Sequence, residues 1–352
     1  MKLKWLKDGK IIKLFDNKNY KKHNKYYSYN YVEELTEEEN YLLKKSILWE
    51  GKTPLLKSKL YKGLYFKNEG SNPAGSFKDR ESSFVFKILD RYWKLNNKEL
   101  LVVSSGNAAI SAILYGNYFD TKVKVLVSRS IWSHKLDILR KLWANVEIVG
   151  DDYEETYRYV VENHDLYSDY INITAWISDW RDEANKLISY ESVEQLWWKE
   201  IDYVIVPIWN GWCFWGVYKW FWEMKKSWLI DKIPYIIWVQ VKNASPIDMS
   251  VQLWIENYEI WKGKVVDSVA DGIVARESYC SPKVLEVIKR NHGEIITVDE
   301  NEIKDWYEIF LKEWLLVEYT SAVVYSVYKK QEEKFSWKRV VAIITWNWQK
   351  LL

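Results

Sequence analysis

Short runs of β-branched and aliphatic residues alternate with longer amphipathic stretches from Leu100 onward, and this alternation constrains the fold more than any other feature. Short apolar runs suit buried strands, and longer stretches with apolar positions three or four residues apart suit helices. Strands that alternate with helices build parallel sheets with helical crossovers, so we predict an α/β chain. The predicted strands are Leu100–Val103, Val123–Val127, Val146–Val149, Tyr170–Ile173, Tyr203–Ile208, Ile236–Val241, Glu294–Val298 and Val340–Ile344. The predicted helices are Asn107–Tyr118, Lys135–Trp143, Tyr153–Asn163, Asp182–Leu196, Phe214–Lys226, Pro282–Arg290, Glu302–Glu313 and Ser321–Gln331.

Charge and cysteine content exclude several classes of function. The 352 residues carry 51 Lys and Arg against 49 Asp and Glu, so the balance indicates neither nucleic acid nor an anionic membrane as a partner. No uncharged apolar run approaches the roughly 18 residues of a membrane-spanning helix, and no leader pattern follows Met1, so we expect a cytoplasmic protein. Cys213, Cys280 and four scattered histidines predict neither a disulfide scaffold nor a metal site.

Tryptophan is unusually frequent. The chain has 23 tryptophans and only 13 glycines, although glycine alone averages about 7% of residues in globular proteins. Several tryptophans occupy positions that would suit glycine, for example Trp143 at the end of a predicted helix, Trp228 and Trp314.

The segment Asn68–Arg80 carries a candidate nucleophile. Small residues and a proline lead to Lys78 at the start of a helical pattern. A helix amino terminus disfavours positive charge, so a neutral, nucleophilic amine is easier to obtain there. A helix cap with a nearby lysine gives the same pattern, so both interpretations stay open at this point.

A second segment, Val102–Ala109, reads as a strand, a turn of small residues and a helix start. The N–H groups of such a turn form a site for a carboxylate or a phosphate. Asn107 could donate a hydrogen bond from the rim of that site. The alternative is structural: serine as a helix cap and asparagine as a turn residue.

Together and in this order, the two segments resemble the β-family of pyridoxal-phosphate enzymes, and within it the threonine synthases. The resemblance extends over most of the chain, from Glu50 to Asn347. It implies that Lys78 binds pyridoxal 5′-phosphate covalently, that Asn107 contacts the ring hydroxyl, and that Thr345 faces the pyridine nitrogen. A neutral hydroxyl there leaves that nitrogen unprotonated, which favours elimination and replacement. The resemblance also implies Phe77 at the cofactor, and Ser104, Ser105, Gly106 and Ala108 around the amino-acid carboxylate.

The cofactor phosphate of this family lies on a glycine-rich loop, and Pro207–Phe214 is the matching segment. The loop residues expected to bind the phosphate are Trp209, Asn210, Gly211, Trp212 and Cys213. Tryptophan replaces family glycines at Trp209, Trp212, Trp346 and Trp348, with further cases expected at Trp176 and Trp238, and Tyr319 stands where the family usually has proline. An indole should obstruct both a backbone that approaches an oxyanion and a positive φ.

Three origins are open for this exchange: a natural, degenerate paralogue, a deliberately altered sequence, or glycines misassigned as tryptophan. A GGG codon becomes TGG by one base. So many exchanges at positions that require glycine would each cost several kcal/mol, which favours the second and third origins.

The resemblance implies a pyridoxal-phosphate-dependent carbon–oxygen lyase that converts O-phosphohomoserine and water to threonine and phosphate. Lys78 would move protons between the α, β and γ carbons while phosphate leaves the γ carbon and water adds at the β carbon. Arg181 and Lys186 are expected to bind the substrate phosphate, with intrahelical charge pairs as the alternative. A cysteate synthase, a serine or threonine dehydratase, and a non-catalytic paralogue on the same scaffold remain as alternatives.

The implied architecture is fold type II, with two α/β domains of mostly parallel sheets and the cofactor in the cleft between them. Residues 1–84 and 176–352 are expected to form the larger domain, with 1–50 as an amino-terminal extension, and residues 85–175 the smaller inserted domain. We expect a homodimer with a small-molecule amino-acid phosphate substrate.

Overall fold

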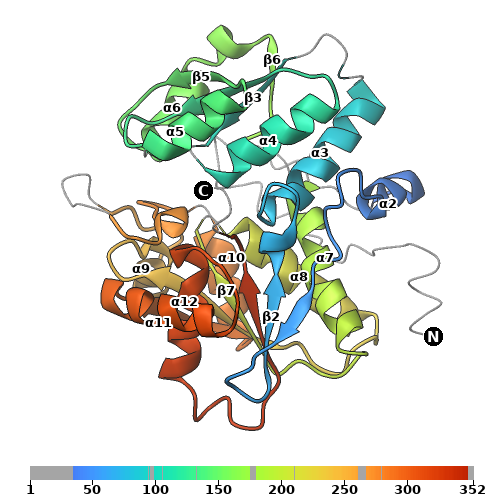
Figure 1. Cartoon of the computed structure of the whole chain (residues 1–352), viewed down its shortest axis with the longest axis vertical. Coiled ribbons are helices and arrows are strands. Elements are labelled where there is room, and N and C mark those ends of the chain that lie inside the picture. The colour runs from blue at the N-terminus through green and yellow to red at the C-terminus, as the bar shows by residue number, and fades with distance from the viewer. Residues whose placement is uncertain are drawn as a thin grey trace. The chain divides into compact units, whose positions relative to one another are not determined.

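The computed structural model describes residues 35–93, 95, 99–104, 106–131, 133–174, 180–209, 211–260, 267–278 and 280–347. They fall into two units, each with its own sheet (Figure 1). Unit 1 contains Lys78–Ala184 together with the described residues up to Glu50, and unit 2 contains Gly51–Phe77 and the described residues from Asn185 onward.

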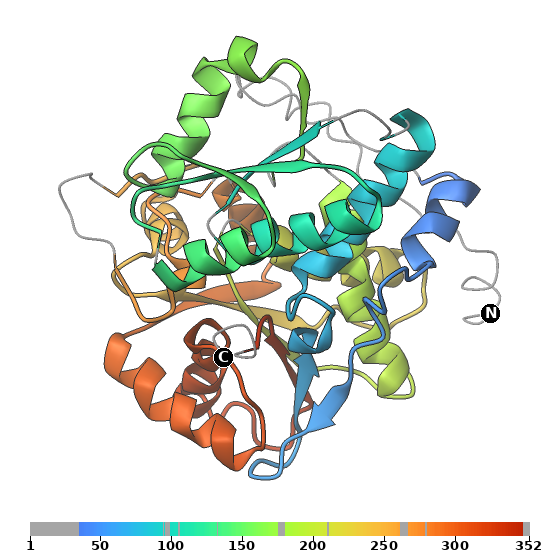
Figure 2. The ribbon, with the colours of Figure 1, turned by 45° about the horizontal axis from the view of Figure 1, so that its top comes forward.

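Unit 1 is built on a four-stranded parallel sheet in the order β5-β4-β3-β6. The two central strands are almost fully buried, as their unbroken valine and leucine runs require in a sheet covered on both faces. Right-handed crossovers place α4 and α5 on one face and α6 on the other, and the sheet can be followed in Figure 2. The bounds are β3 (Glu99–Val103), α4 (Asn107–Tyr118), β4 (Val123–Val127), α5 (Ser133–Lys141), β5 (Asn145–Ile148), α6 (Tyr153–Glu162), η3 (His164–Tyr167) and β6 (Tyr170–Asn172).

Two further helices belong to unit 1, namely α2 (Glu37–Lys44) and α3 (Lys78–Trp93). Helix α3 packs on both α2 and α4. The buried carboxylate of Glu50 accepts hydrogen bonds from the backbone N–H of Leu48 (2.8 Å) and from the hydroxyl of Ser83 in α3. These contacts group residues 35–50 and α3 with the smaller sheet, whereas the sequence-based bounds assigned 1–84 to the larger domain.

Unit 2 is built on a six-stranded sheet in the order β1-β2-β10-β7-β8-β9, in which only the β1–β2 pair is antiparallel. Helix α12 packs on four of these strands and on α11, so nearly all of its side chains are buried and it is apolar on most faces. The bounds are β1 (Leu55–Lys57), β2 (Leu64–Asn68), η2 (Glu69–Ser71), α7 (Trp180–Gln195, which starts in unit 1), β7 (Tyr203–Pro207), α8 (Trp212–Lys226), β8 (Tyr235–Val241), α9 (Pro246–Leu253), η5 (Asp271–Ile273), α10 (Ser281–Lys289), β9 (Gly293–Val298), α11 (Glu300–Lys312), α12 (Tyr319–Lys330) and β10 (Val340–Ile344).

The predicted α/β class is confirmed, and α4, β4 and β10 have the predicted bounds. The sequence reading missed β1, β2, α2 and α9. Strand β1 has only three residues, and Lys67 in β2 interrupts an apolar run although its side chain is fully buried. The ammonium of Lys67 is held by Glu191 (2.6 Å) and by the carbonyl of Thr53 (2.6 Å), which offsets the cost of burying the charge.

Tryptophan occupies most of the left-handed positions that glycine does not occupy in the described chain. Eleven non-glycine residues of the described chain have positive φ, and eight of them are tryptophan. At Trp143 the N–H donates to Arg140 O (2.9 Å) while Ala144 N donates to Leu139 O (3.1 Å), a Schellman ending whose left-handed residue is usually glycine. The same pair of bonds ends α8 at Trp228, α9 at Trp254 and α11 at Trp314.

These geometries confirm that Trp143, Trp228 and Trp314 occupy positions suited to glycine. Trp238 differs, because it lies fully buried within extended β8, and a Cβ on neighbouring Gly293 would come within 2.6 Å of its indole. Trp176 and Trp348 lie outside the described residues.

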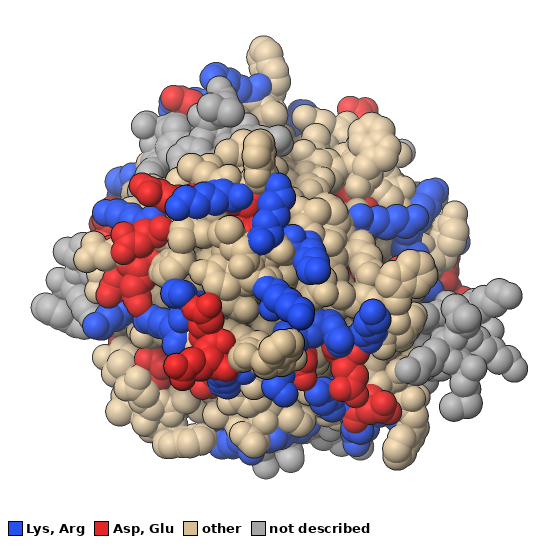
Figure 3. Space-filling view, turned by 60° about the horizontal axis from the view of Figure 1, so that its bottom comes forward, with Lys and Arg blue, Asp and Glu red and all other residues tan. Residues whose placement is uncertain are grey.

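No helix in the described part of the chain combines the length and the apolar character needed to cross a membrane. Figure 3 shows basic and acidic side chains lying next to one another on one face of the molecule, as the near-balanced charge of the sequence leads one to expect.

Candidate active site

Three segments follow the carboxyl ends of neighbouring strands in unit 2. Strands β2, β10 and β7 are adjacent and parallel, and they are followed by residues 69–77, 345–347 and 208–213 respectively. Ligands of open α/β sheets bind beyond the carboxyl ends of strands, where successive connections run in opposite directions. This edge of the sheet is therefore the candidate site of unit 2.

Backbone pairing holds the segment before Lys78 against the residues after β10. Phe77 N donates to Thr345 O (3.3 Å) and Asn347 N donates to Gly75 O (3.2 Å). Ser76 and Trp346 form an isolated β-bridge between these bonds. Two predicted site residues, Phe77 and Thr345, are thus neighbours although 268 positions separate them in the sequence.

The side chain of Thr345 is nearly buried, and its hydroxyl lies 3.3 Å from the hydroxyl of Ser321 in α12. Ser321 Oγ also accepts from Trp346 N (3.1 Å) and lies 3.0 Å from Trp346 O. Ser321 therefore orients Thr345, and the sequence reading did not identify it as a site residue. The only available signal was its place beside Tyr319 and Thr320 in a segment that resembles a family motif.

The loop after β7 closes on Gly211, which precedes α8 with φ of 79°. A Cβ on Gly211 would lie 2.1 Å from the sulfur of Cys280, so no other residue fits there without rearrangement. The first N–H groups of the 15-residue helix α8 have no acceptor within the helix, as at any helix amino terminus, and can bind an anion.

The neighbours of Gly211 are placed as follows. The indole of Trp209 is half-buried and packs against the hydrophobic core of unit 2, and Cys213 is buried in the first turn of α8. Asn210 lies outside the described residues. Trp212 begins α8, but its side chain is outside the description.

In unit 1 the predicted turn follows the carboxyl end of β3, which lies between β4 and β6 in the sheet. The chain runs from β3 through β4 to β5 on one side of β3 and then returns to β6 on its other side. The carboxyl end of β3 is therefore the switch point of that sheet. Gly106 N donates to Ser104 Oγ (3.2 Å), and a Cβ on Gly106 would meet no atom within 4 Å. Asn107 and Ala108 begin α4 and are half-exposed, whereas Ser105 lies outside the described residues.

Lys78 is the first residue of α3, as its sequence context predicted. The residue is 8% exposed, and its ammonium lies 3.0 and 3.1 Å from the two carboxylate oxygens of Glu81. Glu81 is a second residue that the sequence reading missed. Its spacing of three from Lys78, which places both side chains on one face of a helix, was the available signal.

Arg181 and Lys186 are both buried and bound to carboxylates. Arg181 Nη1 lies 2.8 Å from Glu81, and Nη2 donates to the carbonyl of Ile173. Lys186 Nζ lies 2.7 and 2.8 Å from the two oxygens of Glu223 in α8. Neither acidic partner was expected from the sequence, because both are far from their cations along the chain.

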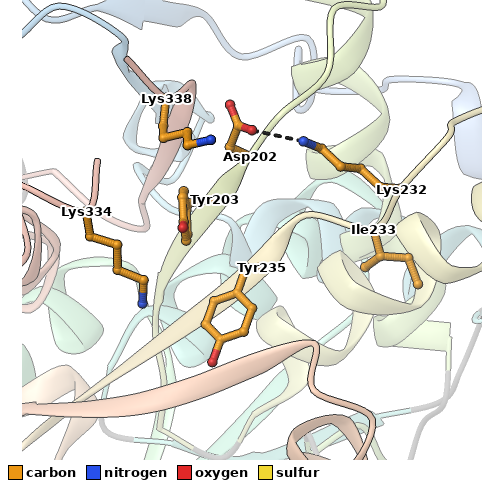
Figure 4. Close-up of a pocket in the computed structure, with 7 residues that line it drawn as sticks. All are labelled: Asp202, Tyr203, Lys232, Ile233, Tyr235, Lys334 and Lys338. Carbon is orange, nitrogen blue, oxygen red and sulfur yellow. Dashed lines mark hydrogen bonds and ion pairs between the residues drawn. The ribbon is translucent and has the colours of Figure 1, made fainter. Parts of the chain in front are cut away.

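A pocket of about 400 Å³ lies at the opposite, amino-terminal edge of the unit 2 sheet (Figure 4). Lys232 pairs there with Asp202 (2.9 Å), and Lys334 pairs with Glu294 (2.5 Å), so carboxylates neutralise two of its three lysines. None of the predicted site residues lines this pocket. Its lining is Asp202, Tyr203, Lys232, Ile233, Tyr235, Lys334 and Lys338.

Unit 2 thus offers an anion-binding helix terminus and an oriented neutral hydroxyl, and unit 1 offers a buried amine. Residues 47–345 match the family described as pyridoxal-phosphate dependent enzyme. A threonine synthase of Methanocaldococcus jannaschii is 29% identical over 82% of this chain and 71% of its own length. A threonine synthase of Methanosarcina acetivorans is 27% identical over 72% of this chain and 63% of its own length. The structure of maize serine racemase, at 21% identity, matches 84% of this chain and 88% of its own with a TM-score of 0.70, which shows a shared fold.

Proposed function

Because this chain belongs to the pyridoxal-phosphate dependent enzymes, we propose that it is a threonine synthase that converts O-phosphohomoserine and water to L-threonine and phosphate. The observation that carries the proposal is the arrangement at the unit 2 sheet edge, where Thr345 lies against Phe77, the residue directly before Lys78. The likeness to two archaeal threonine synthases supports the choice of reaction.

The residues present fit pyridoxal 5′-phosphate. The amine of Lys78 suits the aldehyde, the amino terminus of α8 suits the phosphate, and the hydroxyl of Thr345 suits the pyridine nitrogen. Gly211 supports this assignment independently, since its φ of 79° and its approach to Cys280 leave no room for a side chain at this position of the loop. When bound, the cofactor supplies an electron-accepting ring for a substrate amino acid.

In our proposal each polar group has one task. Lys78 holds the cofactor and moves protons at its Nζ, while Thr345, oriented by Ser321, keeps the environment of the ring nitrogen neutral. Asn107 donates to the ring hydroxyl. The serine-rich turn and the first N–H groups of α4 bind the substrate carboxylate, through Ser104, Ser105, Gly106 and Ala108.

The two cations predicted for the substrate phosphate are bound to buried carboxylates. Arg181 and Lys186 were predicted for it, yet Glu81 and Glu223 already hold these two cations. A substrate phosphate would have to compete with both carboxylates.

Phosphate release and amino-acid analysis test the proposal directly. The chain with added cofactor should release phosphate from O-phosphohomoserine and form threonine in equal amounts, and Lys78→Ala should do neither. Borohydride reduction followed by peptide mapping should locate the cofactor on Lys78, and an adduct on another lysine would remove the basis of the proposal.

The same preparation distinguishes the alternatives. Sulfite-dependent phosphate release from O-phosphoserine would identify a cysteate synthase, and ammonia release from serine or threonine would identify a dehydratase. Cofactor uptake without turnover of any of these substrates would indicate a non-catalytic paralogue. We also propose a homodimer in the cytoplasm, and light scattering during size exclusion tests the dimer.

A further inference from the structure

A buried carboxylate binds the amine on which the proposed reaction depends. Glu81 follows Lys78 by one helical turn of α3, and its side chain is fully buried. Both of its oxygens lie close to Lys78 Nζ, at 3.1 and 3.0 Å. The amine is therefore held at a fixed position on the helix.

The same carboxylate also binds a second cation. Arg181 Nη1 lies 2.8 Å from Glu81 Oε2, the oxygen that lies 3.0 Å from Lys78 Nζ. Arg181 is 2% exposed and also donates to the carbonyl of Ile173. One buried negative charge thus lies between two positive charges, all within unit 1.

Arg181 gives Glu81 a charge partner that does not depend on the charge of Lys78. A buried charge without a partner costs several kcal/mol. When Lys78 is an ammonium, the three groups carry one net positive charge, and when it is a neutral amine, Glu81 and Arg181 remain a neutral pair. Arg181 thus allows Lys78 to become nucleophilic without leaving Glu81 unpaired.

We infer that Glu81 and Arg181 are positioning residues for Lys78, with Glu81 fixing the amine and Arg181 balancing Glu81 once the amine is neutral. The inference rests on the proposed role of Lys78 and deepens it. It assigns Arg181 to the amine rather than to the substrate phosphate. The other buried charges on the two helices are Asp79, Arg80 and Lys87 of α3 and Asp182, Glu183, Lys186 and Glu191 of α7. Asp79 accepts from Ser111 of α4 (2.6 Å), and α4 itself carries no charged residue.

The test measures the amine without cofactor or substrate. The full chain without added cofactor is treated with trace acetic anhydride over a pH series, and mass spectrometry quantifies acetylation of Lys78. Only the neutral amine reacts, so the midpoint of the profile reports its protonation whatever its exposure.

The two single variants should shift the midpoint in opposite directions. Arg181→Met should raise it by about one pH unit, a roughly tenfold slower acetylation below the midpoint, because it removes a nearby positive charge. Glu81→Gln should lower it by a similar amount. The double variant Glu81→Gln/Arg181→Met should return close to the parent, and it retains a balanced interior if either single variant folds poorly.

Glu191→Gln is the matched control. It neutralises a buried carboxylate that also holds a lysine ammonium, Lys67 at 2.6 Å, but in unit 2. The Lys78 midpoint should be unchanged in this variant. A shift as large as that of Glu81→Gln would mean that any loss of a buried carboxylate alters Lys78, and would overturn the inference.

A kinetic comparison separates the two roles of Arg181. An unchanged Lys78 midpoint in Arg181→Met, together with a raised KM for O-phosphohomoserine, would assign Arg181 to the substrate phosphate and overturn the inference. Failure of the proposed function is distinct, since it would appear as absent threonine formation in the parent while the acetylation midpoints remain measurable.

Discussion

Left-handed backbone is costly for a residue with a Cβ, by roughly 1–2 kcal/mol, because the Cβ approaches the following carbonyl oxygen. Tryptophan bears this cost at eight described positions in this chain. At Trp143 the indole is 94% exposed, so little burial offsets the strain. The backbone conformation at such positions is set by the helix ending and not by the side chain.

Trp143→Gly should therefore stabilise the protein by about 1 kcal/mol, since glycine adopts positive φ without the Cβ penalty and the indole makes few contacts. Urea unfolding of the parent and the variant measures the change. An unchanged or lowered midpoint would mean that the indole contributes contacts that outweigh the strain.

Trp306→Gly is the opposite control. Trp306 lies inside helix α11, and its ring stacks on Tyr325 with centroids 5.6 Å apart. Glycine costs about 1 kcal/mol in a helix interior before the lost ring contacts are counted, so this variant should be destabilised. If both Trp143→Gly and Trp306→Gly were more stable than the parent, the backbone conformation at the exchanged position would not decide the change in stability.

At the scale of elements, helix α3 combines site residues with a buried polar network. Lys87 in this helix is buried, donates to the carbonyl of Lys45 and lies 3.8 Å from Glu50. Burial lowers the pKa of Lys87 from its ordinary 10.5 to about 8, although the charge of Glu50 opposes the shift. The folded protein therefore releases this proton at lower pH than the unfolded chain.

This difference predicts a pH dependence of stability. Between pH 8 and 10.5 the unfolded chain holds one more proton at Lys87 than the folded protein, so the free energy of unfolding should rise with pH, by up to about 1.4 kcal/mol per unit. Lys87→Met should lack this contribution. Chemical unfolding at several pH values compares the two proteins, and Lys122→Met, at an exposed surface pair, should behave like the parent.

A second prediction at the scale of elements concerns cofactor binding by the loop between β7 and α8. A phosphate cradle needs several N–H groups within about 2.7–3.1 Å of the oxygens, and an indole in place of a glycine hydrogen is expected to restrict that approach. Trp209→Gly with Trp212→Gly should tighten cofactor binding, each removed clash contributing on the order of 1–3 kcal/mol. Equilibrium dialysis of pyridoxal phosphate measures the affinity, with Trp143→Gly as the control for an unrelated exchange. Equal affinities for all three proteins would mean that the tryptophans do not obstruct the phosphate site.

At the scale of the whole molecule, the left-handed tryptophans are distributed over both units. Trp143 ends α5 in unit 1, whereas Trp228, Trp254 and Trp314 end three helices of unit 2. Substitutions that share no partners add in their effects on stability. A variant that combines all four exchanges to glycine therefore tests whether their effects on stability add over the whole chain.

The quadruple glycine variant at these positions should gain about the sum of the four single gains, roughly 4 kcal/mol, because each strain is local to its own helix ending. Urea unfolding of all five variants tests additivity. A combined gain no larger than that of the best single variant would show that the strains are coupled through a common rearrangement.

The element order was readable from the sequence because periodicity is a local property. The short length and the β-branched residues of runs such as Val340–Ile344 favour buried strands, and the length of Asn107–Tyr118 favours a helix, so the α/β class follows without knowledge of the neighbours. The positions of Lys78 and of the turn after Val103 at helix starts were readable for the same reason. The burial of Lys67 in a strand could not be predicted in this way, because it depends on a carboxylate 124 residues away.

Only the tertiary structure decided which of these elements lie next to one another. Strand β10 is inserted between β2 and β7, and this order, which depends on burial between distant elements, brings Thr345 beside Phe77. It also decided the partners of the buried cations, since Glu81 and Glu223 reach Arg181 and Lys186 from other helices. The sequence by itself determined the chemical groups and the elements that carry them, because residue type and period are local. Their distances and charge partners were decided by packing, because a buried charge must find its partner wherever the fold places one.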